Sequence, residues 1–322
     1  MFRTGIWTVA LVALLSGLVA CPSAQVRAQD TAAASLPAAP SAELSGQRVF
    51  TAGHSFHVFV PNILNDLCRR AGVKDPTQVG VQSIGGSRVI QHWELAEERN
   101  KLNPALATGK IYVLTLSPIY LPDAGIENIA RFALEHNPDI RITLQEFWLP
   151  YDVYDANYQR RRPAAPDRDN GSLETLRAAH DEYFRTIDNE VRTLNEKLGR
   201  PVLFVVPAGQ AMLALREKIA AGEAPGLKAQ SDLFTDAIGH VRPPAQILVA
   251  YCQFAVTYRR SPVGLPLPAA LEKAMPDRET AEALNRLLQQ LAWEAAVQHP
   301  LAGVNASSGG EAATLGGRDP AR

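Results

Sequence analysis

A serine stands directly after the first apolar run of the chain, within the segment Gly53–His57. The run itself, residues 48–52, predicts a strand, and helical periodicity from about residue 61 to 71 predicts a helix soon after it. Gly53 lets the chain turn tightly, so that Ser55 stands at the carboxyl end of a strand, close to the free N–H groups of a helix start. A nucleophile for acyl transfer can be presented in this way. The alternative is a serine that only caps the helix.

A base for such a serine lies far downstream, in the segment 231–240. A serine hydroxyl needs an imidazole within hydrogen-bond reach, and the imidazole needs a carboxylate that fixes its tautomer and stabilises its protonated form. His240 and Asp236 can supply this pair. Asp232 is a second candidate for the carboxylate.

Two adjacent glycines follow the second predicted strand, which covers residues 79–83. Gly85 and Gly86 could let a backbone N–H approach a substrate oxygen closely. A tight turn without a catalytic role is the alternative.

These three segments, taken in order, resemble the SGNH (GDSL-like) hydrolases over about residues 46–265. The resemblance implies that Ser55 is the nucleophile, His240 its base and Asp236 the orienting carboxylate. It also implies an oxyanion hole built from the backbone N–H groups of Ser55 and of Gly86 or Gly85.

Two features depart from the family pattern. The family places Gly-x-Asn-Asp after the third strand, but this chain has Leu116–Tyr120, without an asparagine to donate to the oxyanion. A missing oxyanion donor typically costs about 100- to 1000-fold in turnover. The second departure is spacing, because Asp236 lies four residues before His240 where the family has three.

Aromatic and polar side chains gather in Gln145–Asp152, directly after the fourth predicted strand. Glu146 and Trp148 could form a sugar-binding rim, because sugar rings stack on aromatic rings while their hydroxyls need polar partners, and His54 could also contact substrate. Ordinary loop packing is the alternative. The predicted substrate is a small-molecule or polysaccharide ester.

Two other functions remain open. A metal-dependent hydrolase could draw its ligands from five side chains, namely His54, His57, Asp232, Asp236 and His240, although the helical His-Glu-x-x-His context is missing. A non-catalytic ligand- or glycan-binding module could keep the fold without turnover. No nucleotide loop of the Gly-x-x-x-x-Gly-Lys type is present, so no cofactor is expected. The favoured serine mechanism needs no metal.

Short apolar runs alternate with longer segments of helical periodicity. Strands are predicted at 48–52, 79–83, 111–116, 140–145 and 202–206, and helices at about 61–71, 125–135, 173–198, 244–258 and 279–297. The alternation predicts a three-layer α/β/α domain with a mostly parallel, flavodoxin-like sheet, whose reactive groups gather beyond the carboxyl ends of the strands.

The N-terminal segment predicts export. Residues 1–21 read as a signal peptide, and Leu18–Cys21 matches the bacterial lipobox, in which Cys21 would carry the lipid. Residues 24–28 offer an ordinary signal-peptidase site instead. We therefore expect a periplasmic or outer-surface protein that touches the membrane only through such a lipid.

The remaining boundaries follow from composition. Residues 22–45 form a linker rich in Ala, Ser, Pro and Gln, residues 266–300 form a C-terminal helical extension, and residues 301–322 form a disordered tail. We expect the helix within the extension to pack on the domain; the oligomeric state stays open. Cys68 and Cys252 are expected to be two buried thiols, or a single bridge if their helices are neighbours.

Charge excludes one class of partner. The 322 residues carry 32 Lys and Arg against 33 Asp and Glu, a net charge of -1. Without a basic patch, nucleic acid is not an expected ligand.

Overall fold

The structure, a computed structural model, describes residues 45–154 and 163–305. All of these described residues belong to one compact unit. The predicted signal peptide, Cys21, nearly all of the linker and most of the C-terminal tail lie outside the described residues.

Five parallel strands form the central sheet. They are β1 (Arg48–Gly53), β2 (Thr77–Ser83), β3 (Val113–Leu116), β4 (Arg141–Gln145) and β5 (Leu203–Val206), in the order β2-β1-β3-β4-β5. This is the flavodoxin-like order, so the predicted fold class is confirmed. β3 is buried at every residue, as its continuous apolar sequence requires of a strand covered on both faces.

The order of the strands creates a switch point between β1 and β3. The chain leaves β1 toward β2 on one side and leaves β3 toward β4 on the other, so the two connections diverge. In open parallel sheets, ligands bind in the crevice outside the carboxyl ends of the strands at such a point. The residues that follow β1, including Ser55, lie there.

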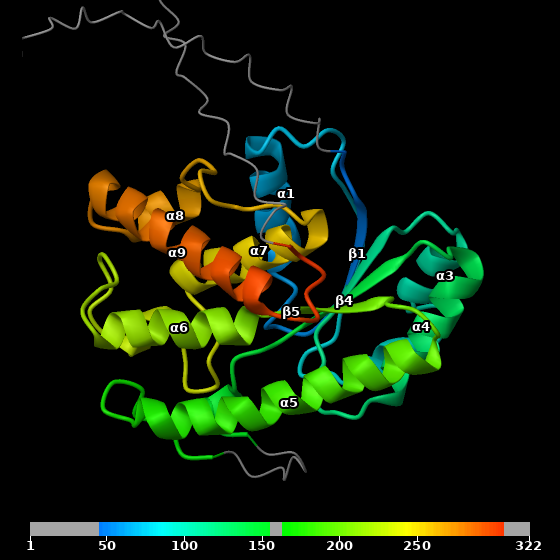
Figure 1. The fold of residues 1–322 in the computed structure, drawn as a ribbon, viewed down its shortest axis with the longest axis horizontal. Helices are drawn as coiled ribbons and strands as arrows, with labels where there is room; N and C mark the ends of the chain where they lie inside the picture. The colour runs from blue at the N-terminus through cyan, green and yellow to red at the C-terminus, as the bar shows by residue number, and fades with distance from the viewer. Residues whose placement is uncertain (1–44, 155–162, 306–322) are drawn as a thin grey trace, which may run out of the picture. The chain divides into compact units, whose positions relative to one another are not determined.

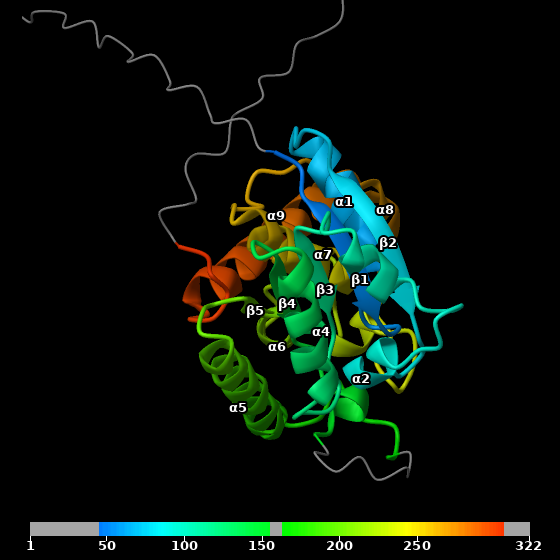
Figure 2. The ribbon, with the colours of Figure 1, turned by 90° about the vertical axis from the view of Figure 1, so that its right-hand side faces the viewer.

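Helices cover both faces of the sheet (Figures 1 and 2). One layer contains α1 (Val60–Arg70), α6 (Ala208–Ala220), α7 (Pro243–Tyr258), α8 (Ala269–Ala274) and α9 (Arg278–Gln298). The other contains α2 (Val89–Trp93), α3 (Leu102–Ala107), α4 (Ala124–His136) and α5 (Leu173–Lys197). Two 3₁₀ turns, η1 (Pro150–Asp152) and η2 (Gln230–Leu233), lie in the connections.

Each predicted element has bounds within two residues of the observed ones, and the four helices α2, α3, α6 and α8 were not predicted. Three of these four have only five or six residues, too few to establish a helical period. α6 is amphipathic only weakly, because Ala and Gly occupy much of its first half.

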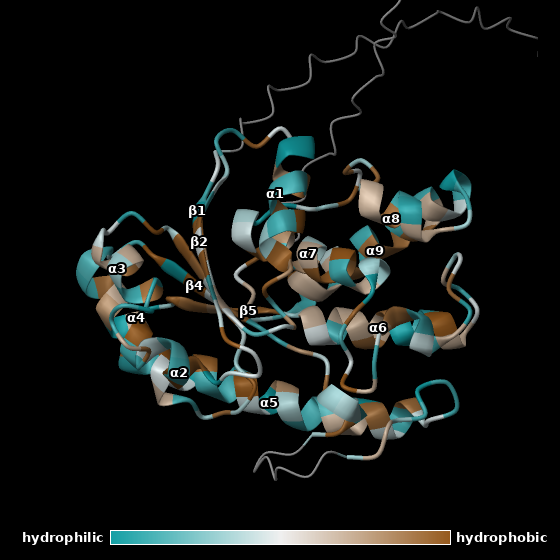
Figure 3. Cartoon of the chain, turned by 180° about the vertical axis from the view of Figure 1, so that it is seen from behind, coloured by the Kyte–Doolittle hydropathy of each residue, from teal (hydrophilic) through white to brown (hydrophobic). Residues whose placement is uncertain are grey.

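Helix α7 is the centre of its layer. Nearly all of its residues are buried, as expected for a helix that is apolar on every side. α9 packs along it and places Leu284 and Leu288 in the core (Figure 1). Figure 3 shows teal and brown alternating along α5, which faces water on one side.

The two cysteines of the domain are free thiols. Cys68 and Cys252 are both buried, and burial raises the pKa of each. The prediction of two buried thiols is confirmed, and the bridge is absent. Within the described ranges, no helix is long and apolar enough to cross a membrane.

A buried ionic cluster binds His299, the residue after α9, to Asp188 and Glu146. Nε2 of His299 lies 3.3 Å from Asp188 Oδ1 and 3.6 Å from Glu146 Oε1, and Glu146 is fully buried. Burial on its own lowers the pKa of His299, but the hydrogen bonds and charges of Asp188 and Glu146 outweigh it and raise this pKa to about 9. The imidazolium form therefore stabilises the fold at neutral pH.

We expect this cluster to make stability depend on alkaline pH. A folded-state pKa above the unfolded value contributes stability that is complete below about pH 6.5 and is lost as the pH rises through about 9. At 1.36 kcal/mol per pH unit, the loss is about 3 kcal/mol. Urea unfolding of the wild type at pH 6.5 and 10 should show it, and the His299→Gln variant should not. His136→Gln, which changes an exposed histidine on α4, serves as the control and should lose stability as the wild type does. If His299→Gln lost as much stability between pH 6.5 and 10 as the wild type, His299 would not be the group responsible.

Candidate active site

The turn after β1 presents Ser55 to solvent. The backbone N–H groups of His57 and Val58 both donate to the carbonyl oxygen of His54, at 2.9 and 3.0 Å. These bonds close a tight turn before α1, with His54, Phe56 and His57 buried and Ser55 alone exposed within it. The serine is thus carried by a turn, and the helix begins five residues later.

The loop before α7 brings an imidazole and a carboxylate to this serine. Nε2 of His240 lies 2.8 Å from Ser55 Oγ, and Nδ1 of the same ring lies 2.6 Å from Asp236 Oδ2. The first pair is 185 residues apart in the chain. The three side chains that sequence motifs single out as a triad are therefore in contact.

The hydrogen bonds define the tautomer of His240. Asp236 is a pure acceptor when ionised, so Nδ1 of His240 carries a proton and Nε2 is free to accept the Ser55 hydroxyl. Partial burial pushes the pKa of Asp236 up, but the His240 ring and two backbone N–H groups lower it further, so that it lies below its ordinary value. A carboxylate that stays ionised can hold the ring in this orientation.

The unusual spacing of this pair is explained by the loop. Asp236 Oδ1 accepts hydrogen bonds from the backbone N–H groups of Gly239 and His240, at 2.9 and 3.1 Å. Gly239 has φ +110°, a conformation that glycine adopts easily, and it folds the chain back toward the carboxylate. Asp232 lies apart from the ring: its Oδ2 accepts from the backbone of Lys228 and Ala229. Asp236, not Asp232, orients His240.

The glycine loop after β2 lies beside the serine turn. Gly53 pairs with Ser83 in the sheet, and the N–H of Ile84 donates to the Gly53 carbonyl at 3.1 Å. Gly85 and Gly86 follow, both exposed, and Gly86 has φ +60°. The backbone N–H groups of Ser55, Gly85 and Gly86 make no hydrogen bond to another described residue. They remain available to a ligand oxygen.

The position after β3, where the family has its asparagine block, holds a buried serine. Ser117 Oγ lies 3.2 Å from Nε2 of His54, and the N–H of Phe56 donates to Nδ1 of that ring. His54 therefore carries its proton on Nε2 and donates to Ser117. Burial, with the charges of neighbouring histidines, lowers the pKa of His54 to about 3, so the ring is neutral. The prediction that His54 contacts substrate does not fit its burial; it supports the serine turn from below.

A second buried network supports the same turn. Gln145 at the end of β4 donates from Nε2 to the Phe56 carbonyl, so its Oε1 accepts from Nδ1 of His57 at 2.8 Å and from Nε2 of Gln253 at 3.1 Å. The other ring nitrogen of His57 then accepts the hydroxyl of Thr115. Sequence patterns do not reveal this network, because its members come from four separate elements.

The aromatic and acidic segment after β4 is not an open sugar-binding rim. Glu146 is fully buried, where it accepts from the backbone and side chain of Gln210. Trp148 is buried as well; its ring stacks on Phe56 at 4.9 Å, and its Nε1 donates to the Gly239 carbonyl at 2.7 Å. Both predictions of substrate contact are corrected by this burial. Trp148 instead holds the loop that carries His240 against the serine turn.

The candidate metal ligands are engaged with protein partners. Both ring nitrogens of His54 and of His57 are in hydrogen bonds, and Asp232 faces the backbone. Over the part of the chain that the structure covers, no group of three His, Cys, Asp or Glu side chains is arranged to hold a metal ion.

No family model matches this chain, and no curated protein matches it by sequence. Among solved structures, a DUF4886 family protein from Bacteroides uniformis is 13% identical with a TM-score of 0.49, and the match covers 80% of this chain and 96% of that one.

Two further solved structures are similar to this chain. A candidate SGNH hydrolase from Slackia heliotrinireducens is 14% identical with a TM-score of 0.39, covering 65% and 97% of the two chains. A candidate GDSL-like lipase from Parabacteroides merdae is 16% identical with a TM-score of 0.41, covering 65% and 95%. The structural neighbours of the chain thus include proteins assigned to the family that its motifs resemble.

Proposed function

We propose that this protein is an exported ester hydrolase in which Ser55 is the nucleophile, His240 the general base and Asp236 the orienting carboxylate. One observation carries the proposal: the continuous hydrogen-bonded chain from Asp236 through His240 to an exposed serine, at 2.6 and 2.8 Å. A nucleophile that is hydrogen-bonded to a base, which is in turn held by an orienting carboxylate, is the arrangement that activates a hydroxyl for acyl transfer.

In the first half-reaction, Ser55 Oγ attacks the ester carbonyl carbon and its proton passes to Nε2 of His240. The carbonyl oxygen becomes an oxyanion, which the free N–H groups of Ser55 and Gly86 can bind. Collapse of the tetrahedral intermediate breaks the bond to the alcohol oxygen. The alcohol leaves with the proton from His240, and the acyl group stays on Ser55.

The second half-reaction returns the enzyme to its starting state. Water attacks the acyl carbon and gives a proton to His240 Nε2. The intermediate then collapses, the acid leaves, and Ser55 Oγ recovers its proton. Asp236 stabilises the imidazolium in both halves and does not itself take the proton.

The substrate that suits this proposal is an ester met outside the cytoplasm, a small molecule or an acyl group on a polysaccharide. The leader-like residues 1–21 support export, and Cys21 supports a lipid anchor. Mass spectrometry of the mature N-terminus tests both: a diacylglyceryl cysteine at position 21 is expected for the anchored form, and cleavage near residue 28 would indicate simple secretion.

A fluorophosphonate probe tests the proposed chemistry directly. The probe should label the purified protein, and mass mapping should find the adduct on Ser55. The rate of hydrolysis of a chromogenic acetyl ester should fall in proportion to the fraction of protein that is labelled. Absence of labelling together with absence of turnover would favour a non-catalytic binding module on the same fold.

Chelation separates this mechanism from a metal-dependent one. We expect EDTA to leave turnover of the acetyl ester unchanged, because the histidine and aspartate side chains near the serine are engaged with the protein or with each other. Turnover is measured before and after dialysis against EDTA. Loss of activity that returns on adding Zn²⁺ would contradict the serine mechanism.

A further inference from the structure

Every backbone carbonyl of the loop that carries the base accepts a hydrogen bond. The carbonyls of residues 236 to 240 accept, in order, from Arg168 Nη1 at 2.9 Å, Arg168 Nη2 at 2.9 Å, Tyr151 N at 3.1 Å, Trp148 Nε1 at 2.7 Å and Thr235 N at 2.7 Å. Four of these five donors belong to segments outside the loop. The backbone of the loop is therefore fixed by its surroundings, although its side chains reach solvent.

Arg168 makes two of these bonds and is itself fixed in place. Its guanidinium lies 4.2 Å above the ring of Phe234, at the start of the loop, and its Nε lies 3.7 Å from Asp152 Oδ1. Asp152 is in turn bound by both Nη groups of Arg216, at 2.9 and 2.8 Å. A planar fork anchored in this way can bind two adjacent carbonyls at once, which a lysine cannot do.

The side chains of the base and its carboxylate are only partly buried. The side chains of Asp236 and His240 are 41% and 35% exposed, and the His240 ring packs edge-on against Phe56, with 5.3 Å between the ring centroids. A contact of 2.8 Å between His240 Nε2 and Ser55 Oγ then depends on the position of the backbone, and a displacement of about 1 Å can cost about 100-fold in rate.

We propose that Arg168 is a positioning residue for the reaction, which holds the Asp236–His240 loop in register with Ser55 through the carbonyls of Asp236 and Ala237. The inference rests on the proposed function. Arg168 touches neither substrate nor the reacting atoms, so its loss should lower kcat and leave KM nearly unchanged.

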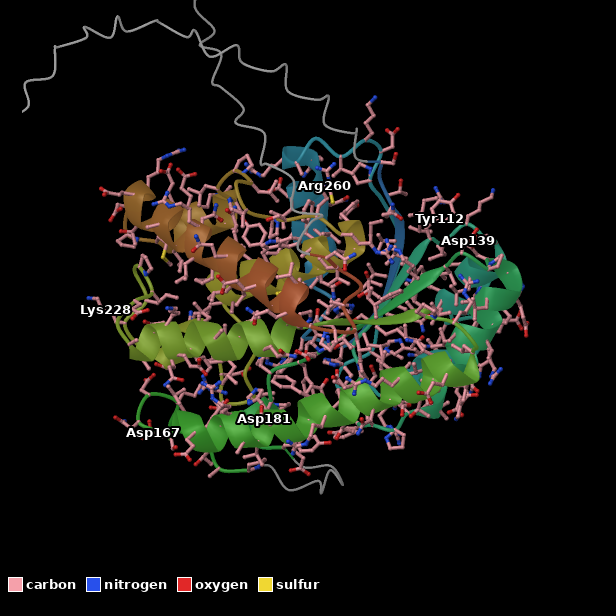
Figure 4. The ribbon with its side chains drawn as sticks, in the orientation of Figure 1. Tyr112, Asp139, Asp167, Asp181, Lys228 and Arg260 are labelled. Carbon is pink, nitrogen blue, oxygen red and sulfur yellow. The ribbon has the colours of Figure 1, made fainter. Side chains whose placement is uncertain are left out.

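The structure offers a matched control at the other end of the sheet. Arg141, the first residue of β4, also donates from both Nη groups to two adjacent carbonyls, those of Val256 and Thr257. Figure 4 labels Asp139, close to Arg141, and Asp167, next to Arg168, on opposite sides of the molecule. Arg141→Met removes a comparable pair of bonds far from the serine.

The test compares Arg168→Met and Arg168→Lys with Arg141→Met and the wild type. We expect Arg168→Met to lower both kcat and the rate of fluorophosphonate labelling about 100-fold, and Arg168→Lys to lose less because it keeps one donor. Arg141→Met should label at the wild-type rate. Methionine keeps an unbranched apolar side chain at position 168, and circular dichroism checks that each variant is folded.

Chemical rescue gives a readout that a general loss of stability would not give. Millimolar guanidinium should restore part of the labelling rate of Arg168→Ala and should not accelerate Arg141→Met. Wild-type labelling rates in Arg168→Met, or an equal loss in Arg141→Met, would overturn the positioning role. If the wild type itself does not label, the proposed function fails, and this result is distinct from failure of the positioning role.

Discussion

Replacing Ser55 with alanine should lower turnover of an acetyl ester by about 10⁵-fold or more. Nucleophile and base act as one unit, because the alcohol attacks only as its proton moves to the imidazole, so His240→Ala should cost about as much. The double variant should be no slower than either single variant, because neither residue works without the other. Steady-state kinetics on the purified proteins, compared with buffer hydrolysis, measures all three.

The control for this series is Ser261→Ala, which removes a hydroxyl from the loop after α7. It should keep wild-type turnover. A Ser55→Ala protein with half of the wild-type activity would mean that another group is the nucleophile. A further tenfold loss in the double variant would mean that His240 acts on something other than Ser55.

Replacing Asp236 with asparagine should lower kcat by about 10³- to 10⁴-fold. The amide is nearly isosteric, but its NH₂ group can turn toward Nδ1 of His240 and leave the proton on Nε2, where it cannot accept from Ser55. The carboxylate side chain is partly exposed, and water can replace some of its effect, so the loss should be smaller than for Ser55. Asp232→Asn is the matched control and should change kcat less than twofold, since Asp232 binds only backbone N–H groups.

The pH dependence of the reaction follows from the same geometry. The pKa of Asp236 lies below its ordinary value of 3.8, so the group remains ionised as the solution is acidified through pH 5. The pH profile of kcat/KM should therefore show no loss of activity from protonation of Asp236 down to about pH 5. A loss near pH 5 that is present in the wild type and absent in Asp236→Asn would contradict an ionised Asp236.

Sequence patterns were sufficient to predict the sheet and to place Ser55 and the glycine loop at one edge of it, whereas the contact between Ser55 and His240 was predicted through the family resemblance. Continuous apolar runs identify buried strands, and parallel strands bring their carboxyl ends to one edge, so residues that follow different strands meet there. The choice between Asp232 and Asp236 could not be made in this way, because it depends on the turn at Gly239. Only the folded loop shows which carboxylate reaches the ring.

The interpretation of Glu146 and Trp148 as a substrate rim failed for a related reason. Whether an aromatic or acidic residue after a strand is exposed or buried depends on the side chains and loops that pack over it, and these come from parts of the chain far away in sequence. Gly239 accepts the indole N–H of Trp148 from 91 positions away, and Gln210 lies over Glu146 from 64 positions away. Arg168 likewise binds the backbone carbonyls of Asp236 and Ala237, and a pattern of side-chain types cannot predict contacts with the backbone.

The burial of α7 on all sides has a consequence for the limits of the folding unit. A chain ended at residue 265, where the family resemblance stops, would leave the apolar flank of α7 facing water and would leave Tyr251 without its hydrogen bond to Asn285 at 2.7 Å. Such a fragment should aggregate when expressed. The smallest piece expected to fold by itself runs through Val304, because the N–H of Val205 in β5 donates to the carbonyl of Leu301 and because Ala302 and Val304 are buried.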